Sequence, residues 1–139
     1  MEKVDFSDLG IKSFDRCRNG IMLSKISDDL FLKCYDENYL LDLREQYVDL
    51  EGKILNVDYG KIDSNIVVPK SVVYKDGSFF GYTMPFIYGK PIYDVFDKLS
   101  FSQLCELYLK LEKIVKKSNN IVFPDMLSDG NIIVMIWWI

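Results

Sequence analysis

The sequence predicts an α+β fold in which hairpins alternate with helices. Residues 20–35 and 66–84 combine β-branched and aromatic side chains with polar turns, a pattern typical of hairpins. Residues 40–54 and 101–117 repeat apolar side chains at about 3.6-residue spacing, which is typical of helices. The chain has 139 residues, of which 49% are hydrophobic, so it is long enough to bury a core.

The first hairpin is expected between Gly20 and Tyr35. Strands are expected over Gly20–Ile26 and Leu30–Tyr35, and the polar cluster Ser27–Asp29 supplies the turn between them. A turn of three polar residues favours antiparallel pairing of the two strands.

One helix is expected next, over Leu40–Ile54. Asp36 or Asn38 supplies its N-terminal cap, and Gly52 weakens the pattern near its C-terminal end. The polar stretch Asn56–Asn65 that follows is typical of a loop.

The second hairpin has the stronger local signal. Ile66–Val68 leads through a proline into Ser71–Tyr74, and Phe79–Met84 returns after the turn Lys75–Ser78. The Asp-Gly pair in this turn is among the best short-range indicators of a hairpin. Pro85 cannot donate to a strand ladder and should mark the end of the second strand.

A long helix and two short strands are expected in the last part. Ser100 and Gln103 have the spacing of a capping box, and the apolar stripe that follows extends the helix over residues 101–117. Ile121–Phe123 and Asn131–Val134 are typical of short strands on either side of a polar loop.

Composition excludes several function classes. The chain has no histidine, so it cannot hold a Ser-His-Asp site, a His metal cluster or a His general base. Cys17, Cys34 and Cys105 are odd in number and far apart, which indicates neither a zinc site nor a disulfide framework and favours a reducing, cytoplasmic setting. The net charge of −4 disfavours nucleic-acid binding, and no apolar run is long enough to span a membrane.

Three features could carry chemistry, and each has a plain structural alternative. Lys33 interrupts an apolar strand, although a lysine facing outward from a half-exposed strand would look the same. Asp125 and Asn131 flank a loop and offer a base and a hard metal ligand, yet such residues are also common in turns. Met84–Lys90 offers backbone groups to a flat ring, or is an ordinary link from strand to helix.

The order of these features resembles the protein-kinase-like fold, of a divergent bacterial or phage kind. A strand lysine precedes a helix, and then come a hairpin, a connector, a long helix and an Asp…Asn loop. The resemblance implies an N-terminal lobe and hinge over residues 1–87, with an antiparallel sheet and one helix. It also implies the first helix and catalytic loop of an incomplete C-terminal lobe over residues 88–139.

By resemblance, Lys33 would hold the α- and β-phosphates of ATP. A glutamate of the helix would pair with it, and Glu45 is the first choice while Glu51 stays open. Met84 resembles the residue at the rear of the adenine pocket. Further along the chain the resemblance assigns adenine-binding backbone groups to Pro85 and Ile87, the catalytic base to Asp125 and a Mg²⁺ ligand to Asn131.

The chain also departs from the kinase pattern. Phe123-Pro124-Asp125 replaces His-Arg-Asp, Gly20 stands where three glycines are typical, and no residue matches the Asp of an Asp-Phe-Gly motif. The family transfers phosphate from ATP to a protein Ser or Thr, but we expect this chain alone to be inactive. An alternative is a non-catalytic module of pseudokinase type that binds a nucleotide or a protein.

One more expectation concerns the long helix over residues 101–117. In a kinase-like fold later helices would pack on its apolar stripe, so here the stripe should be exposed. We therefore expect self-association or a protein partner. A third reading is an α+β domain whose likeness to kinases is accidental.

Overall fold

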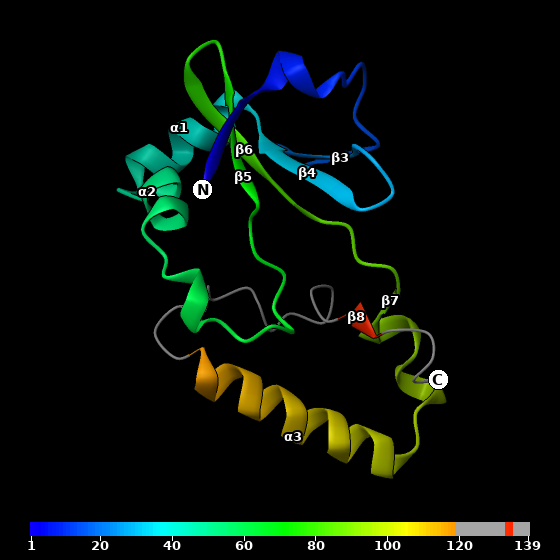
Figure 1. The fold of residues 1–139 in the computed structure, drawn as a ribbon. Coiled ribbons are helices and arrows are strands. Elements are labelled where there is room, and N and C mark those ends of the chain that lie inside the picture. The colour runs from blue at the N-terminus through cyan, green and yellow to red at the C-terminus, as the bar shows by residue number, and fades with distance from the viewer. Residues whose placement is uncertain (119–132, 135–139) are drawn as a thin grey trace. The chain divides into compact units, whose positions relative to one another are not determined.

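The computed structural model describes residues 1–118 and Ile133–Val134 (Figure 1). The chain forms two compact units. The first comprises residues 1–57 and 67–86, and the second comprises residues 58–66 and the chain from residue 87 onward. The sequence placed a boundary after residue 87 but did not indicate that residues 58–66 associate with the second unit.

A six-stranded mixed sheet forms the centre of the first unit, in the order β1-β5-β6-β4-β3-β2. Strand β1 pairs with β5 in parallel, and the other neighbouring strands pair antiparallel, so the expectation of a wholly antiparallel sheet was wrong. The strands are β1 (Glu2–Asp5), β2 (Arg16–Arg18), β3 (Ile21–Lys25), β4 (Leu30–Tyr35), β5 (Ser71–Lys75) and β6 (Ser78–Pro85).

Two hairpins of this sheet, β2–β3 and β5–β6, close with two-residue turns. Asp76 and Gly77 join β5 to β6 with φ angles of 51° and 76°, which confirms the predicted Asp-Gly turn. Asn19 and Gly20 join β2 to β3 with φ angles of 51° and 78°. Positive φ at both central residues is typical of the type I′ turn, whose twist matches that of paired strands. Residues 66–68 are not part of a strand, contrary to the sequence prediction.

Two helices, not one, follow β4. Helix α1 (Glu37–Glu45) begins after Asp36, whose carboxylate accepts a hydrogen bond from the amide of Tyr39, so the cap is Asp36 and not the alternative Asn38. Tyr47 then adopts a positive φ of 57° and is 97% exposed, which ends the helical path.

Helix α2 (Leu50–Leu55) starts anew after Asp49. The Asp49 carboxylate accepts a hydrogen bond from the amide of Gly52, and a Cβ at position 52 would lie only 2.1 Å from that carboxylate. Gly52 therefore accommodates a new helix cap and does not mark the end of one long helix.

Both faces of the sheet are covered. On one, which we term the helix face, Ile54 of α2 is buried against Tyr35, Val72 and Phe79, and Leu40 of α1 packs beside them. Figure 1 shows α1 and α2 on one side of the sheet. The opposite face buries the strand residues Leu32, Cys34 and Val73 beneath side chains of the N-terminal segment, namely Phe6, Leu9, Ile11 and Phe14.

The second unit is built around helix α3 (Phe101–Lys117). Ser100 and Gln103 form the predicted capping box, and the helix has the predicted bounds. Val95 and Leu99 are buried beside Leu104 and Leu107 of this helix. At its C-terminal end, Ser118 Oγ accepts a hydrogen bond from the amide of Asp63 at 3.2 Å, and Lys117 pairs with the Asp63 carboxylate at 3.4 Å.

A short two-stranded sheet also belongs to the second unit. Strand β7 (Lys90–Pro91) pairs antiparallel with β8 (Ile133–Val134), which falls within the strand expected over residues 131–134. The expected strand over residues 121–123 lies outside the described residues. Among the residues that the structure describes, no helix is long and apolar enough to cross a membrane.

Candidate functional site

Lys33 lies on the helix face of the sheet, in strand β4. Its neighbours Leu32 and Cys34 are fully buried on the opposite face, whereas Tyr35, two residues along, belongs to the core of the helix face. Side chains alternate along a strand, so Lys33 shares the side of Tyr35. The lysine is half-buried. Lys33 therefore occupies a half-buried position on the face of the sheet that α1 and α2 cover.

The Lys33 ammonium lies beside an aromatic ring. Its Nζ lies 6.0 Å from the centroid of the Tyr35 ring, and Tyr82 faces Lys33 directly across the pair β4–β6. Burial raises the pKa of Tyr35 and the pKa of Tyr82, so both hydroxyls stay protonated at neutral pH. The tyrosine rings beside the lysine are therefore neutral, an arrangement that favours a cation.

Met84 occupies the same face one strand away. It faces Phe31 across β4–β6, just as Tyr82 faces Lys33, and directly opposed residues project to the same side of a sheet. The predicted phosphate-binding and adenine-pocket residues are therefore neighbours on one half-buried surface. Pro85 ends β6, as predicted, and Ile87 begins the part of the chain that belongs to the second unit.

The two candidate glutamates lie in different helices. Glu45 is the last residue of α1 and is exposed. Glu51 lies in the first turn of α2, and its carboxylate accepts a hydrogen bond from the hydroxyl of Tyr74. Within residues 1–118, no ion pair joins Lys33 to either glutamate. The pairing of Lys33 with Glu45 or Glu51 stays a prediction.

The predicted catalytic base and metal ligand, Asp125 and Asn131, lie outside the described residues. In the described part of the chain, no group of three or more His, Cys, Asp or Glu side chains could hold a metal ion. The described residues therefore supply the lysine and the apolar wall of the candidate site, and the expected Mg²⁺ ligand is not among them.

Two arginines that were not predicted from the sequence add charge to this face. Arg16 faces Leu23 across β2–β3, and Leu23 in turn faces Lys33 across β3–β4, so all three lie on one row. Arg18, two residues further along β2, projects to the same side. The Asn19-Gly20 pair could have revealed strand β2, because Asn-Gly is a strong signal for a two-residue hairpin loop.

The turn at Gly20 packs against the start of α1. Its carbonyl oxygen accepts a hydrogen bond of 2.8 Å from the amide of Asp36, and a Cβ at position 20 would lie 2.9 Å from the Asp36 carboxylate. The backbone at this turn is thus engaged with the helix start. Positive charge on the face comes from the side chains of Lys33, Arg16 and Arg18.

Comparison with family models, curated proteins and solved structures finds no match to this chain.

Proposed function

We propose that the helix face of the first unit binds an adenine nucleotide, in the manner of a protein-kinase-like N-terminal lobe. The observation that carries this proposal is the placement of Lys33 and Met84 on neighbouring strands of one half-buried face. Lys33 would hold phosphate oxygens, and the apolar surface beside Met84 would pack against the base.

The order of elements supports the proposal. Lys33 is on the third strand of the antiparallel series β2-β3-β4, which is the strand that carries the phosphate-binding lysine in protein kinases. Helices α1 and α2 follow it, and then come the hairpin β5–β6 and the connector to α3. Arg16 and Arg18 on the same face would add attraction for a polyphosphate.

Phosphoryl transfer is not part of the proposal. Kinases stabilise the transferring phosphate mainly by metal ions and placed charges, and no residue of the sequence matches the Asp of an Asp-Phe-Gly motif. We expect the 139-residue chain to bind nucleotide without transferring its γ-phosphate to a protein hydroxyl. In a protein kinase the activity would be transfer of phosphate from ATP to a protein Ser or Thr. For that activity Asp125 stays the predicted catalytic base and Asn131 the predicted Mg²⁺ ligand.

Thermal unfolding in the presence of ATP, with and without Mg²⁺, tests the proposal. A ligand at 100 times its Kd stabilises the folded state by about 2.7 kcal/mol, which is readily measured. We expect a shift that grows with ATP concentration and is lost in Lys33→Ala. Lys12→Ala is the matched control, because Lys12 is an exposed lysine away from the helix face.

Further ligands and variants in the same thermal-unfolding experiment distinguish nucleotide binding from binding of phosphate alone and from a protein-binding role. Tripolyphosphate in place of ATP reports phosphate attraction alone, and an equal shift with both would mean that the base is not recognised. Comparison of the ATP-dependent thermal shifts of Glu45→Gln and Glu51→Gln shows which glutamate assists Lys33. The absence of any ATP shift in the wild-type chain would reject nucleotide binding and leave a protein-binding role.

A further inference from the structure

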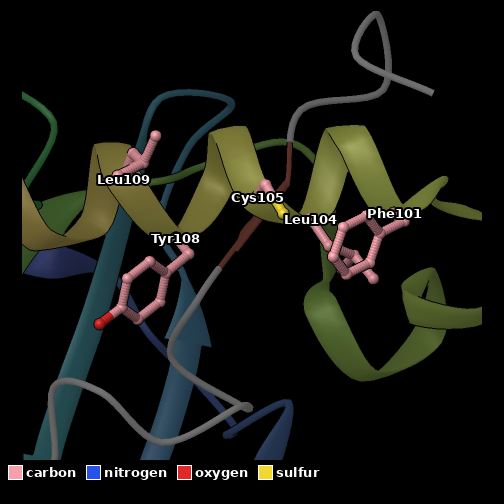
Figure 2. A pocket seen from close by; sticks show the side chains of 5 residues that line it. All are labelled: Phe101, Leu104, Cys105, Tyr108 and Leu109. Atoms are coloured by element: carbon pink, nitrogen blue, oxygen red, sulfur yellow. The ribbon is translucent and has the colours of Figure 1, made fainter.

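The apolar stripe expected on helix α3 is exposed. Phe101, Tyr108 and Leu109 are 83%, 67% and 55% exposed. With Leu104 and Cys105 they line a shallow groove (Figure 2). None of these five residues is Asp, Glu, Lys or Arg, so the groove offers no group that would select a partner by charge. Self-association or a protein partner of this stripe stays a prediction.

Strands β2, β3 and β4 of the first unit differ from this groove in charge. The whole chain has 17 Lys and Arg against 21 Asp and Glu, yet these three strands contain no acidic residue. Their cationic residues are Arg16, Arg18, Lys25 and Lys33. Lys25 pairs with Asp28 at 3.2 Å. This part of the sheet is therefore a basic surface in an acidic chain, and such a surface attracts anions.

The two arginines of β2 are exposed and have no carboxylate partner in the described part of the chain. The carboxylate of Asp15, which precedes Arg16, accepts a hydrogen bond of 2.7 Å from a backbone amide of β3. The carboxylate of Asp36, beside the turn at Gly20, caps helix α1. The acidic side chains that flank β2 and β4 are thus engaged with the backbone, and the guanidinium groups are accessible to an anion from solution.

Arg16 and Lys33 lie two strands apart on one row. Each faces Leu23 of the strand between them. Because neighbouring strands are about 4.8 Å apart, the backbones of the two residues are about 10 Å apart. Met84 lies on the other side of Lys33, because β6 and β3 flank β4. A nucleotide with its base beside Met84 and its first phosphates at Lys33 would therefore extend its terminal phosphate toward β2.

We propose that Arg16 and Arg18 bind the terminal phosphate of this nucleotide, so that the site selects nucleoside triphosphates over diphosphates. The inference rests on the proposed function, and it adds the class of ligand. A guanidinium group binds phosphate oxygens through two parallel hydrogen bonds, which a lysine ammonium cannot do. Leu23 has no polar side-chain group, so the phosphate chain is held by Lys33 at one end and by the arginines at the other.

Isothermal titration calorimetry of the full chain with ATP and with ADP tests this selection. The titrations contain EDTA, because Mg²⁺ would neutralise part of the phosphate charge. We expect ATP to bind about tenfold more tightly than ADP, which is the effect of one hydrogen bond between charged groups. In the double variant Arg16→Gln/Arg18→Gln the two nucleotides should bind equally. Its affinity for ADP should equal that of the wild-type chain, which also verifies that the site is intact.

The double variant Lys12→Gln/Lys75→Gln is the matched control, because it removes the same net charge away from the helix face. Lys12 is exposed, and the Lys75 ammonium lies 5.2 Å from the centroid of the Phe80 ring, which packs on the opposite face. This variant should keep the preference for ATP.

Two results would overturn the selection by the arginines while leaving nucleotide binding intact. One is equal binding of ATP and ADP by the wild-type chain. The other is an ATP preference that persists in Arg16→Gln/Arg18→Gln, or that falls equally in both double variants. If the wild-type chain binds neither nucleotide, the proposed function itself is rejected, and this inference with it.

Discussion

The carboxylate of Glu51 in α2 accepts a hydrogen bond from the hydroxyl of Tyr74 in β5. The bond links the second helix to the sheet on the helix face, where Tyr74 also packs against the core. It engages one of the two glutamates that the kinase resemblance offers as a partner for Lys33. Because this bond engages only Oε1 of Glu51, a pairing with Lys33 would use the other carboxylate oxygen or follow the loss of the bond to Tyr74.

The first prediction concerns Tyr74→Phe, which removes the donor of this bond. The pair is partly exposed, so we expect a loss near the lower end of the usual ~0.5–1.5 kcal/mol for one hydrogen bond. The bond to Glu51 is the main cause that raises the pKa of Tyr74 from 10.0 to about 12. A raised tyrosine pKa means that the stabilisation is complete below pH 10 and is lost as the pH rises toward about 12.

Urea unfolding across this pH range measures the effect. The difference in unfolding free energy between the wild-type chain and Tyr74→Phe should shrink as the pH rises above 10.0. Tyr47→Phe serves as the control, because Tyr47 is 97% exposed and should show no difference at any pH. A difference that is constant with pH would contradict the assignment.

The second prediction concerns Gly81 of β6, which lies close against the backbone of β4. A Cβ at this position would lie 2.2 Å from the carbonyl oxygen of Lys33 and 2.6 Å from the Cα of Cys34. Gly81→Ala must therefore push the two strands apart at the candidate site, at a cost of at least ~1–3 kcal/mol. We also expect the variant to lose the stabilisation by ATP.

Chemical denaturation measures the unfolding free energies of Gly81→Ala and Gly77→Ala. The comparison distinguishes destabilisation by steric crowding at position 81 from destabilisation by backbone strain at position 77. A Cβ at position 77 meets no atom within 4 Å, but the φ of +76° disfavours alanine there. Gly77→Ala should therefore destabilise the chain moderately and leave ATP binding intact. Equal effects of both variants on ATP binding would show that the β4–β6 approach does not shape the site.

The elements with strong local signals were predicted with accurate bounds. Strand β4 and helix α3 match their expected ranges, because an apolar run between turns and a capping box are readable from neighbouring residues alone. Strand β1 was missed because Glu2–Asp5 pairs with β5, about 70 residues away, and carries no local pattern of its own. The break at Tyr47 was missed because the helical spacing of Leu40 and Leu50 continues across it.

The candidate site could be predicted only in part, because it too depends on pairing between strands that are distant in sequence. The sequence singled out Lys33 and Met84, but their common face depends on the register between β4 and β6, which are separated by two helices and a third strand. Pairing between strands that are distant in sequence is set by the packing of both faces of the sheet. The position of Tyr82 opposite Lys33 follows from that register, whereas Tyr35 shares the face of Lys33 through the alternation of side chains along β4.

The third prediction concerns thiol reactivity. Burial raises the pKa of the Cys34 thiol to about 12, so at neutral pH it is almost wholly protonated and also inaccessible. Titration of the native chain with a thiol reagent should therefore modify Cys17 and Cys105 only. Cys34 should react after urea is added, with Cys34→Ala showing no such delayed phase. Rapid reaction of all three thiols without denaturant would contradict the packing of the opposite face.

The fourth prediction concerns the start of α3. Ser100 Oγ accepts a hydrogen bond from the amide of Gln103 at 3.2 Å, and the Gln103 side chain accepts one from the amide of Ser100 at 2.8 Å. Ser100→Ala should cost about 1 kcal/mol, as is usual for the loss of a helix cap. Ser102→Ala is the matched control, because alanine is the better helix former within the helix and should be neutral or slightly stabilising.

A double-mutant cycle tests whether the two bonds act as one unit. Ser100→Ala and Gln103→Ala each break the reciprocal arrangement, so the double variant should lose less than the sum of the single losses. Thermal unfolding of the four chains gives the coupling free energy. Strictly additive losses would mean that Ser100 and Gln103 stabilise the helix independently, and the start of α3 would then owe its position to the packing of Leu99 and Leu104.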